Sequence, residues 1–87
     1  MTYEIIIDKE AIKALKKLPK QVQARITKKI EDLKENPRPE GAKALQGGLN
    51  GLYRIRIGDY RVIYKVENEV VIIYVLKIAH RKSVYNG

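Results

Sequence analysis

The spacing of apolar residues divides the chain into extended and helical segments. Residues 2–7 (TYEIII) form a short run of mostly β-branched residues, which is typical of a strand. Apolar residues then recur every three or four positions, which predicts two helices. The first covers residues 9–18 with Ala11, Ile12, Leu15 and Leu18 on its apolar face, and the second covers residues 20–35 with Val22, Ile26, Ile30 and Leu33.

The predicted helix boundaries carry the residues that such boundaries favour. Asp8 stands where the first helix begins, and its carboxylate can accept a hydrogen bond from a free backbone N–H of the first turn. Pro19 ends the first helix and suits the first turn of the second. The second helix ends at NPRPEG (residues 36–41). Residues 41–51 (GAKALQGGLNG) are then expected to be a flexible linker that Leu45 and Leu49 anchor to the core.

Three more strands follow at residues 52–57, 60–66 and 70–78. Gly58 and Asp59 separate the first two, and a two-residue loop with Gly first favours a type II′ hairpin turn. Residues 70–78 (VVIIYVLKI) are apolar on both faces up to Lys77, which predicts a central strand covered on both sides. We therefore expect an α+β fold in one domain, residues 1–87, with two N-terminal helices packed on a mainly antiparallel sheet in the order strand-helix-helix-strand-strand-strand.

The hairpin combines an apolar face with a cationic one. Side chains alternate across a strand, so a two-residue turn pairs Arg56 directly with Arg61. The apolar face that should pack on the helices holds Ile55, Ile57, Tyr60, Val62 and Tyr64, and the opposite face holds Arg54, Arg56, Arg61 and Lys65.

Two arginines in directly opposed positions destabilise a sheet by a few tenths to about 1 kcal/mol. A bound anion would offset this repulsion, because guanidinium groups match phosphate oxygens with two parallel hydrogen bonds. The alternative is an ordinary solvated face whose long side chains splay apart. The pairing also depends on the turn, since a slip of one residue would separate Arg56 from Arg61.

The composition indicates what kind of partner the protein binds and argues against several kinds of site. The chain has 18 Lys and Arg against 10 Asp and Glu, a net charge of +8, which favours an anionic partner: nucleic acid, a membrane surface or an acidic protein. It contains no cysteine and one histidine, which excludes disulfides, argues against a metal site and suits the cytoplasm. No apolar run approaches the roughly 20 residues that span a bilayer.

The last strand is expected to bring His80, Arg81 and Tyr85 near the same edge of the sheet. Arginines with a histidine and a tyrosine suit phosphoryl transfer without a metal. Ser83, the one serine, lies three residues after His80 and has no evident oxyanion hole, so a Ser–His–Asp site is poorly supported.

The segments KALQGGLNGLYRIRIGDYRVIY and VVIIYVLKIAHRKSVY, with the helical pair and the length, resemble the RelE/ParE superfamily of type II toxin–antitoxin toxins. The resemblance covers nearly the whole chain and implies a microbial-RNase-like fold. RelE-type members cut mRNA in the ribosomal A site without a metal or other cofactor, by attack of the ribose 2′-OH on the adjacent phosphate. Members of the ParE branch inhibit DNA gyrase and lack the cleavage residues.

By motif position the resemblance implies a catalytic set of Arg61, Arg81 and Tyr85, with Arg54, Arg56, Lys65 and His80 as phosphate or RNA contacts. The best-known RelE toxin carries lysines at the positions of Arg54 and Arg56. Arginine stays charged and is a poor general base, so that role falls to Tyr85 by motif position, with His80 as the alternative.

The implied partners are mRNA on the ribosome and a small acidic RelB-like antitoxin in a toxin–antitoxin hetero-oligomer, with no membrane. Two other functions stay open: a ParE-like gyrase inhibitor and a basic binding module whose catalysis has decayed.

Overall fold

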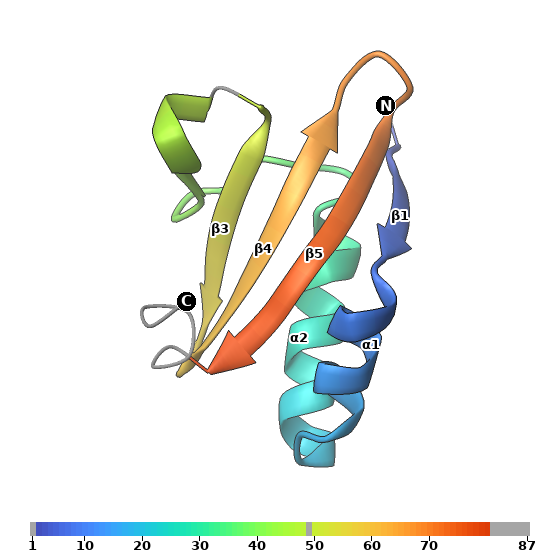
Figure 1. The fold of residues 1–87 in the computed structure, drawn as a ribbon, viewed down its shortest axis with the longest axis vertical. Helices are drawn as coiled ribbons and strands as arrows, with labels where there is room; N and C mark the ends of the chain where they lie inside the picture. Colours follow the sequence, from blue (N-terminus) through green and yellow to red (C-terminus); the bar gives the residue numbers. More distant parts are fainter. Residues whose placement is uncertain (1, 49, 81–87) are drawn as a thin grey trace.

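Both helices lie on the same face of a five-stranded sheet in the computed structural model, which describes residues 2–48 and 50–80 (Figure 1). No helix within these ranges is long and apolar enough to cross a bilayer. In chain order the elements are β1 (Glu4–Ile7), α1 (Lys9–Lys16), α2 (Lys20–Asp32), β2 (Lys43–Ala44), the 3-10 turn η1 (Leu45–Gly48), β3 (Leu52–Ile57), β4 (Tyr60–Glu67) and β5 (Ile72–His80).

The strands lie in the order β1-β5-β4-β3-β2. β1 runs parallel to β5, and the other neighbours are antiparallel, which confirms the predicted α+β architecture. β5 is an interior strand of the sheet, between β1 and β4, whereas the middle position belongs to β4. The expectation that both faces of β5 are covered is wrong, because α1 and α2 occupy one side and leave Leu76 of β5 41% exposed on the strand. We call the side of the sheet away from the helices its open face.

Local capping and apolar spacing account for the helices. The Asp8 carboxylate accepts a hydrogen bond from the Glu10 N–H at 3.1 Å, so Asp8 is the predicted N-cap. The apolar stripe of α2 enters the core as predicted, since Ile26 and Ile30 are buried. The prediction for Ile12 of α1 is wrong, because this side chain is 36% exposed while its neighbour Ala11 takes the buried position.

The segment 41–51 is more regular than the flexible linker expected there. Lys43 and Ala44 form β2, which pairs with Arg54 and Tyr53 of β3, and residues 45–48 form η1. A two-residue strand is held by backbone pairing with its neighbour and is too short to show an alternating pattern of apolar residues. The sequence therefore did not predict β2. Leu45 is half-buried, and Leu49 lies outside the described residues.

A polar network fastens the loop after α2 to the sheet. Arg38 donates from Nε to the Tyr53 hydroxyl at 2.9 Å, and this hydrogen bond raises the pKa of Arg38. Tyr64 stacks on Tyr53 and donates its hydroxyl proton to the Pro37 carbonyl at 2.6 Å. Burial raises the pKa of Tyr64 to about 12, and the neighbouring Tyr53 adds to the rise. This end of the sheet is therefore held by hydrogen bonds as well as by the core.

Candidate functional site

The β3–β4 hairpin has the predicted register. Ile57 pairs with Tyr60 and Arg56 with Arg61. Gly58 has a φ of +59° and the φ of Asp59 is not positive, as a type II′ turn requires. Since Ile57 and Tyr60 close the turn by hydrogen bonds, Arg56 and Arg61 form the next, non-hydrogen-bonded pair, in which Cα atoms approach to about 4.5 Å.

The two faces of the hairpin have the predicted character. Ile55, Ile57, Val62 and Tyr64 are at most 6% exposed and pack in the core with the helices. The open face carries the cations, and strand pairing adds two that sequence reasoning missed: Lys43, opposite Arg54, and Lys77, opposite Ile63. The cationic face thus consists of Lys43, Arg54, Arg56, Arg61, Lys65 and Lys77.

Lys43 and Lys77 were left out of the predicted cationic face for different reasons. Lys43 fell in the expected linker, where no strand was predicted. Lys77 follows a register shift between Ile63 and Tyr64, so its face depends on the pairing of β4 with β5.

The central pair of the cationic face differs in accessibility. Arg56 is exposed, whereas Arg61 is 1% exposed and is the buried charged residue of the described core. A buried cation requires polar partners, and Arg61 does engage in such an interaction. The two guanidinium groups therefore present one accessible and one enclosed positive charge.

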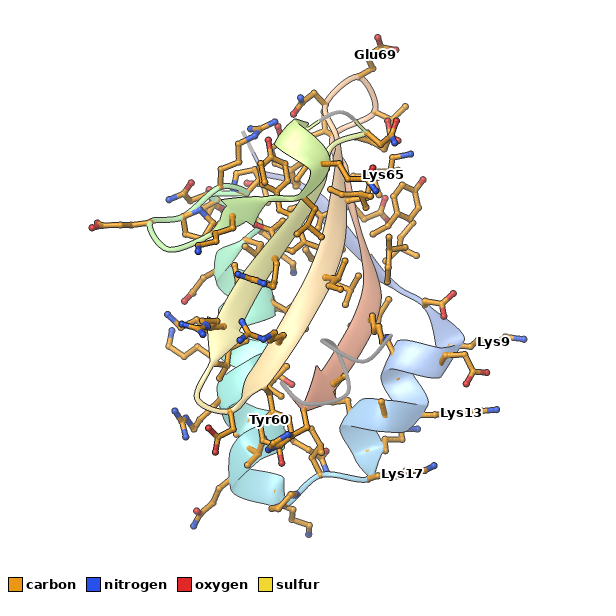
Figure 2. All side chains as sticks on the ribbon, turned by 60° about the vertical axis from the view of Figure 1, so that its left-hand side comes forward. Lys9, Lys13, Lys17, Tyr60, Lys65 and Glu69 are labelled. Atoms are coloured by element: carbon orange, nitrogen blue, oxygen red, sulfur yellow. The ribbon has the colours of Figure 1, made fainter. Side chains whose placement is uncertain are left out.

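Lys65 occupies the other end of β4 from this pair. It is four residues from Arg61, about 13 Å along a strand, and Figure 2 places it far from Tyr60, the first residue of β4. Its ammonium group bonds the Glu67 carboxylate at 2.8 Å. β4 extends one residue beyond the predicted strand to include Glu67, which supplies an acid on the same face.

His80 projects on the helix side of the sheet. It pairs with Tyr60, and their rings meet edge to face with centroids 5.4 Å apart. The neighbouring pair, Arg61 with Ala79, belongs to the open face, so alternation separates His80 from the arginines. Arg81 and Tyr85 lie outside the described residues, and their roles remain predictions.

The chemistry available on the cationic face is anion binding. Guanidinium and ammonium groups donate hydrogen bonds to phosphate oxygens and stabilise negative charge, but arginine does not accept a proton at neutral pH. Residues 2–48 and 50–80 contain no group of three or more His, Cys, Asp or Glu side chains placed to hold a metal ion. A proton acceptor for catalysis would have to come from another residue.

Comparison with known proteins finds relatives that are named as toxins. A family model described as the ParE toxin of the type II toxin–antitoxin system parDE matches residues 5–85. The mRNA interferase toxin RelE of Escherichia coli K12 is 31% identical over 84 residues, which cover 94% of this chain and 86% of the relative.

Solved structures agree with this sequence match. The archaeal RelE–RelB complex from Pyrococcus horikoshii OT3 contains a chain with a TM-score of 0.84 and 39% identity, covering 93% of this chain and 97% of that one. The RelBE2 toxin–antitoxin complex from Mycobacterium tuberculosis gives a TM-score of 0.79 and 28% identity, covering 93% and 100%. Because the family model covers residues 5–85 and these relatives share the fold along most of their length, the chain belongs to the RelE/ParE family of type II toxin–antitoxin toxins.

Proposed function

We propose that this toxin is a metal-independent endoribonuclease that cleaves mRNA in the A site of the ribosome. The observation that carries the proposal is the paired Arg56 and Arg61 on the open face, with Arg54 beside them. A stable fold gains nothing from opposed like charges, whereas a phosphate between them would be bound by several donors. The similarity to the E. coli mRNA interferase RelE supports RNA as the substrate.

In the proposed reaction, the ribose 2′-oxygen attacks the adjacent phosphorus and the bond to the 5′-oxygen breaks. The products are a 2′,3′-cyclic phosphate and a 5′-hydroxyl. Arg54 and Arg56 hold the phosphate, Arg61 clamps its oxygens, and Arg81 stabilises the charge that grows in the transition state. Tyr85 acts as its phenolate, which the surrounding cations favour, and accepts the 2′-hydroxyl proton. The leaving 5′-oxygen takes a proton from water, and the hydroxide that remains takes the proton back from Tyr85.

The positions of His80 and Arg61 bear on two parts of this scheme, the identity of the base and the order of the phosphate contacts. His80 faces the helix side, which supports Tyr85 as the base. Arg61 is 1% exposed, so its contact with a phosphate requires the groups around it to move when RNA binds. Arg56 is already exposed, and we assign it the first contact.

We further propose that a small acidic antitoxin masks this face in the cytoplasm. The solved complexes of similar toxins with RelB antitoxins support such a partner, and the charge of +8 favours an acidic one. The association rate should fall as salt concentration rises, and a rate independent of salt would contradict electrostatic docking.

The proposed activity is tested by mapping mRNA ends by primer extension in a translating extract. The wild-type toxin should produce cuts within codons at the A site. Arg61→Ala, Arg81→Ala and Arg56→Ala should each lower the cutting rate by at least about tenfold, whereas Lys9→Ala, on the outer face of α1, should cut like the wild type (Figure 2). Cutting that survives Arg61→Ala and Arg81→Ala would contradict the site assignment.

One observation favours a second candidate: the matching family model is that of a ParE toxin. A ParE-like protein would leave mRNA intact and block supercoiling by DNA gyrase. A supercoiling assay beside the primer-extension assay separates the two functions. A chain active in neither assay would be the catalytically decayed binding module.

A further inference from the structure

A basic groove runs along the edge of the sheet between α2 and β3. Two adjoining cavities, of about 410 and 330 Å³, share Lys29, Asp32 and Arg56 in their walls. We call the two together the α2–β3 groove. Its cations are Arg25, Lys28, Lys29, Lys43, Arg54 and Arg56.

The groove exists because the neighbouring strand stops early. β2 pairs with Tyr53 and Arg54 and goes no further along β3. The chain that leads into β2 turns at Gly41, whose φ of +93 suits glycine and diverts the backbone from the edge. The backbone N–H and C=O of Arg56 point away from β4, because the hydrogen-bonded pairs are those on either side of it. The strand edge beside Arg56 therefore forms one wall.

One face of α2 forms the opposite wall. Arg25, Lys28 and Lys29 are spaced by three and one residues, which places them on one side of the helix. Arg25 reaches the hairpin: a Cβ on Gly58 would lie 3.6 Å from its Nη2 atom. Two carboxylates also line the groove: Glu40, and Asp32, which pairs with Lys28 at 3.6 Å. The six cations outnumber these two acids, so an excess of positive charge remains in the groove.

The lining favours phosphates over a peptide. Protein partners bind through apolar anchors in pockets, but the exposed large apolar residues of the described chain lie elsewhere: Ile6, Ile12, Val70 and Leu76. The isoleucines of the groove, Ile55 and Ile57, are buried in the core. Exposed flexible cations with outward backbone donors are the groups that contact nucleic acid backbones.

We propose that the α2–β3 groove binds the backbone of the mRNA segment next to the nucleotide that the cationic face holds. Arg56 carries the connection, because it lines both cavities and also pairs with Arg61 on the open face. The RNA path then continues from the open face around the β3 edge to α2. This inference rests on the proposed function, because it takes mRNA as the molecule that occupies the groove.

Binding of 2′-O-methyl RNA to the full chain tests the path, since this RNA cannot be cut by 2′-hydroxyl attack. Two probes are compared: a trinucleotide, which covers the cationic face alone, and an oligomer of about nine nucleotides, which also reaches the groove. The groove variant is Arg25→Gln with Lys29→Gln. The control is Lys9→Gln with Lys17→Gln, which removes the same charge from the two ends of α1, since Lys9 is its first residue and Lys17 its C-cap. Figure 2 shows both side chains pointing away from the sheet.

Each lost phosphate contact on single-stranded RNA lowers affinity about fivefold near 0.1 M salt and lowers the salt slope by about 0.7. The groove variant should therefore bind the longer oligomer about 25-fold more weakly, with a slope reduced by about 1.4. Its affinity for the trinucleotide, and the affinity of the control for both probes, should change less than about threefold.

Equal losses in the groove variant and the control would overturn the proposal, because affinity would then follow total charge. Unchanged RNA binding with weakened binding of polyglutamate would also overturn it and would assign the groove to an acidic protein. These results do not depend on cleavage. A wild-type protein that binds through the groove but cuts no mRNA in the extract would refute the proposed function alone.

Discussion

Replacing Arg56 by threonine should stabilise the fold, although it removes a residue of the proposed site. Arg56 and Arg61 are directly opposed, and no described acid on the hairpin lies between them. Two unit charges about 7 Å apart repel by about 0.6 kcal/mol in water and by about 2 kcal/mol at the effective dielectric constant of about 20 found in proteins, and the partner that Arg61 already has offsets part of this repulsion. We therefore expect the free energy of unfolding to rise by about 0.6–1 kcal/mol, within the range measured for opposed strand residues.

Urea denaturation measures this change, and thermal unfolding gives a second estimate. For a domain of this size, the expected gain raises Tm by about 3–6 °C. Threonine also suits a strand better than arginine, so the matched control is Lys77→Thr. Lys77 is an exposed cation on the same face, but its partner across β4 is Ile63. Arg56→Glu should stabilise further, because it turns the repulsion into an attraction.

If Arg56→Thr is no more stable than Lys77→Thr, the opposed arginines do not destabilise the sheet. The repulsion would then be relieved within the folded chain itself, and the arginine pair would no longer indicate a bound anion. If instead the variant is more stable but no longer cuts mRNA, Arg56 is held at a cost in stability for the sake of function.

Three further changes test the packing. Gly51→Ala should lower the free energy of unfolding by about 2 kcal/mol or more in urea, because Gly51 has φ +69 and an added Cβ would lie 2.6 Å from the Val66 carbonyl oxygen; a neutral result would mean that this backbone can move. Val71→Asn should raise it by about 1 kcal/mol, since Val71 has φ +57 and asparagine tolerates that region; a loss would show that the valine contacts outweigh the strain. Tyr64 has a folded pKa of about 12 against about 10 unfolded, so its contribution is complete below pH 10 and is lost as pH rises to 12. Between these pH values the wild type should lose about 2 kcal/mol more than Tyr64→Phe, and equal losses would refute the shift.

The hairpin could be predicted from the sequence because all its determinants are local. A two-residue turn with Gly58 first fixes the register, and strict alternation then fixes the faces. The helices followed from apolar spacing and the Asp8 cap. Ile12 was misplaced because a helix of eight residues buries a narrow stripe against the sheet.

Other features depend on contacts between distant segments. β2 forms because its residues meet β3, and the face of His80 is set by the pairing of β5 with β4 across a register shift. The burial of Arg61 is likewise decided by its surroundings in three dimensions, since alternation assigns a face and not an exposure. The roles of Arg81 and Tyr85 rest on motif position alone.

The parallel pairing of β1 with β5 has a consequence for synthesis. Glu4 meets Ile72, so the first strand can find its neighbour only after both helices and the β3–β4 hairpin have been made. A nascent or prematurely terminated chain that lacks β5 has its hairpin and helices but nothing to join β1 to β4. Such non-local closure is slow relative to helix formation. We therefore expect chains truncated before β5 to lack the toxin fold, because β1 has no strand to pair with until β5 has been made.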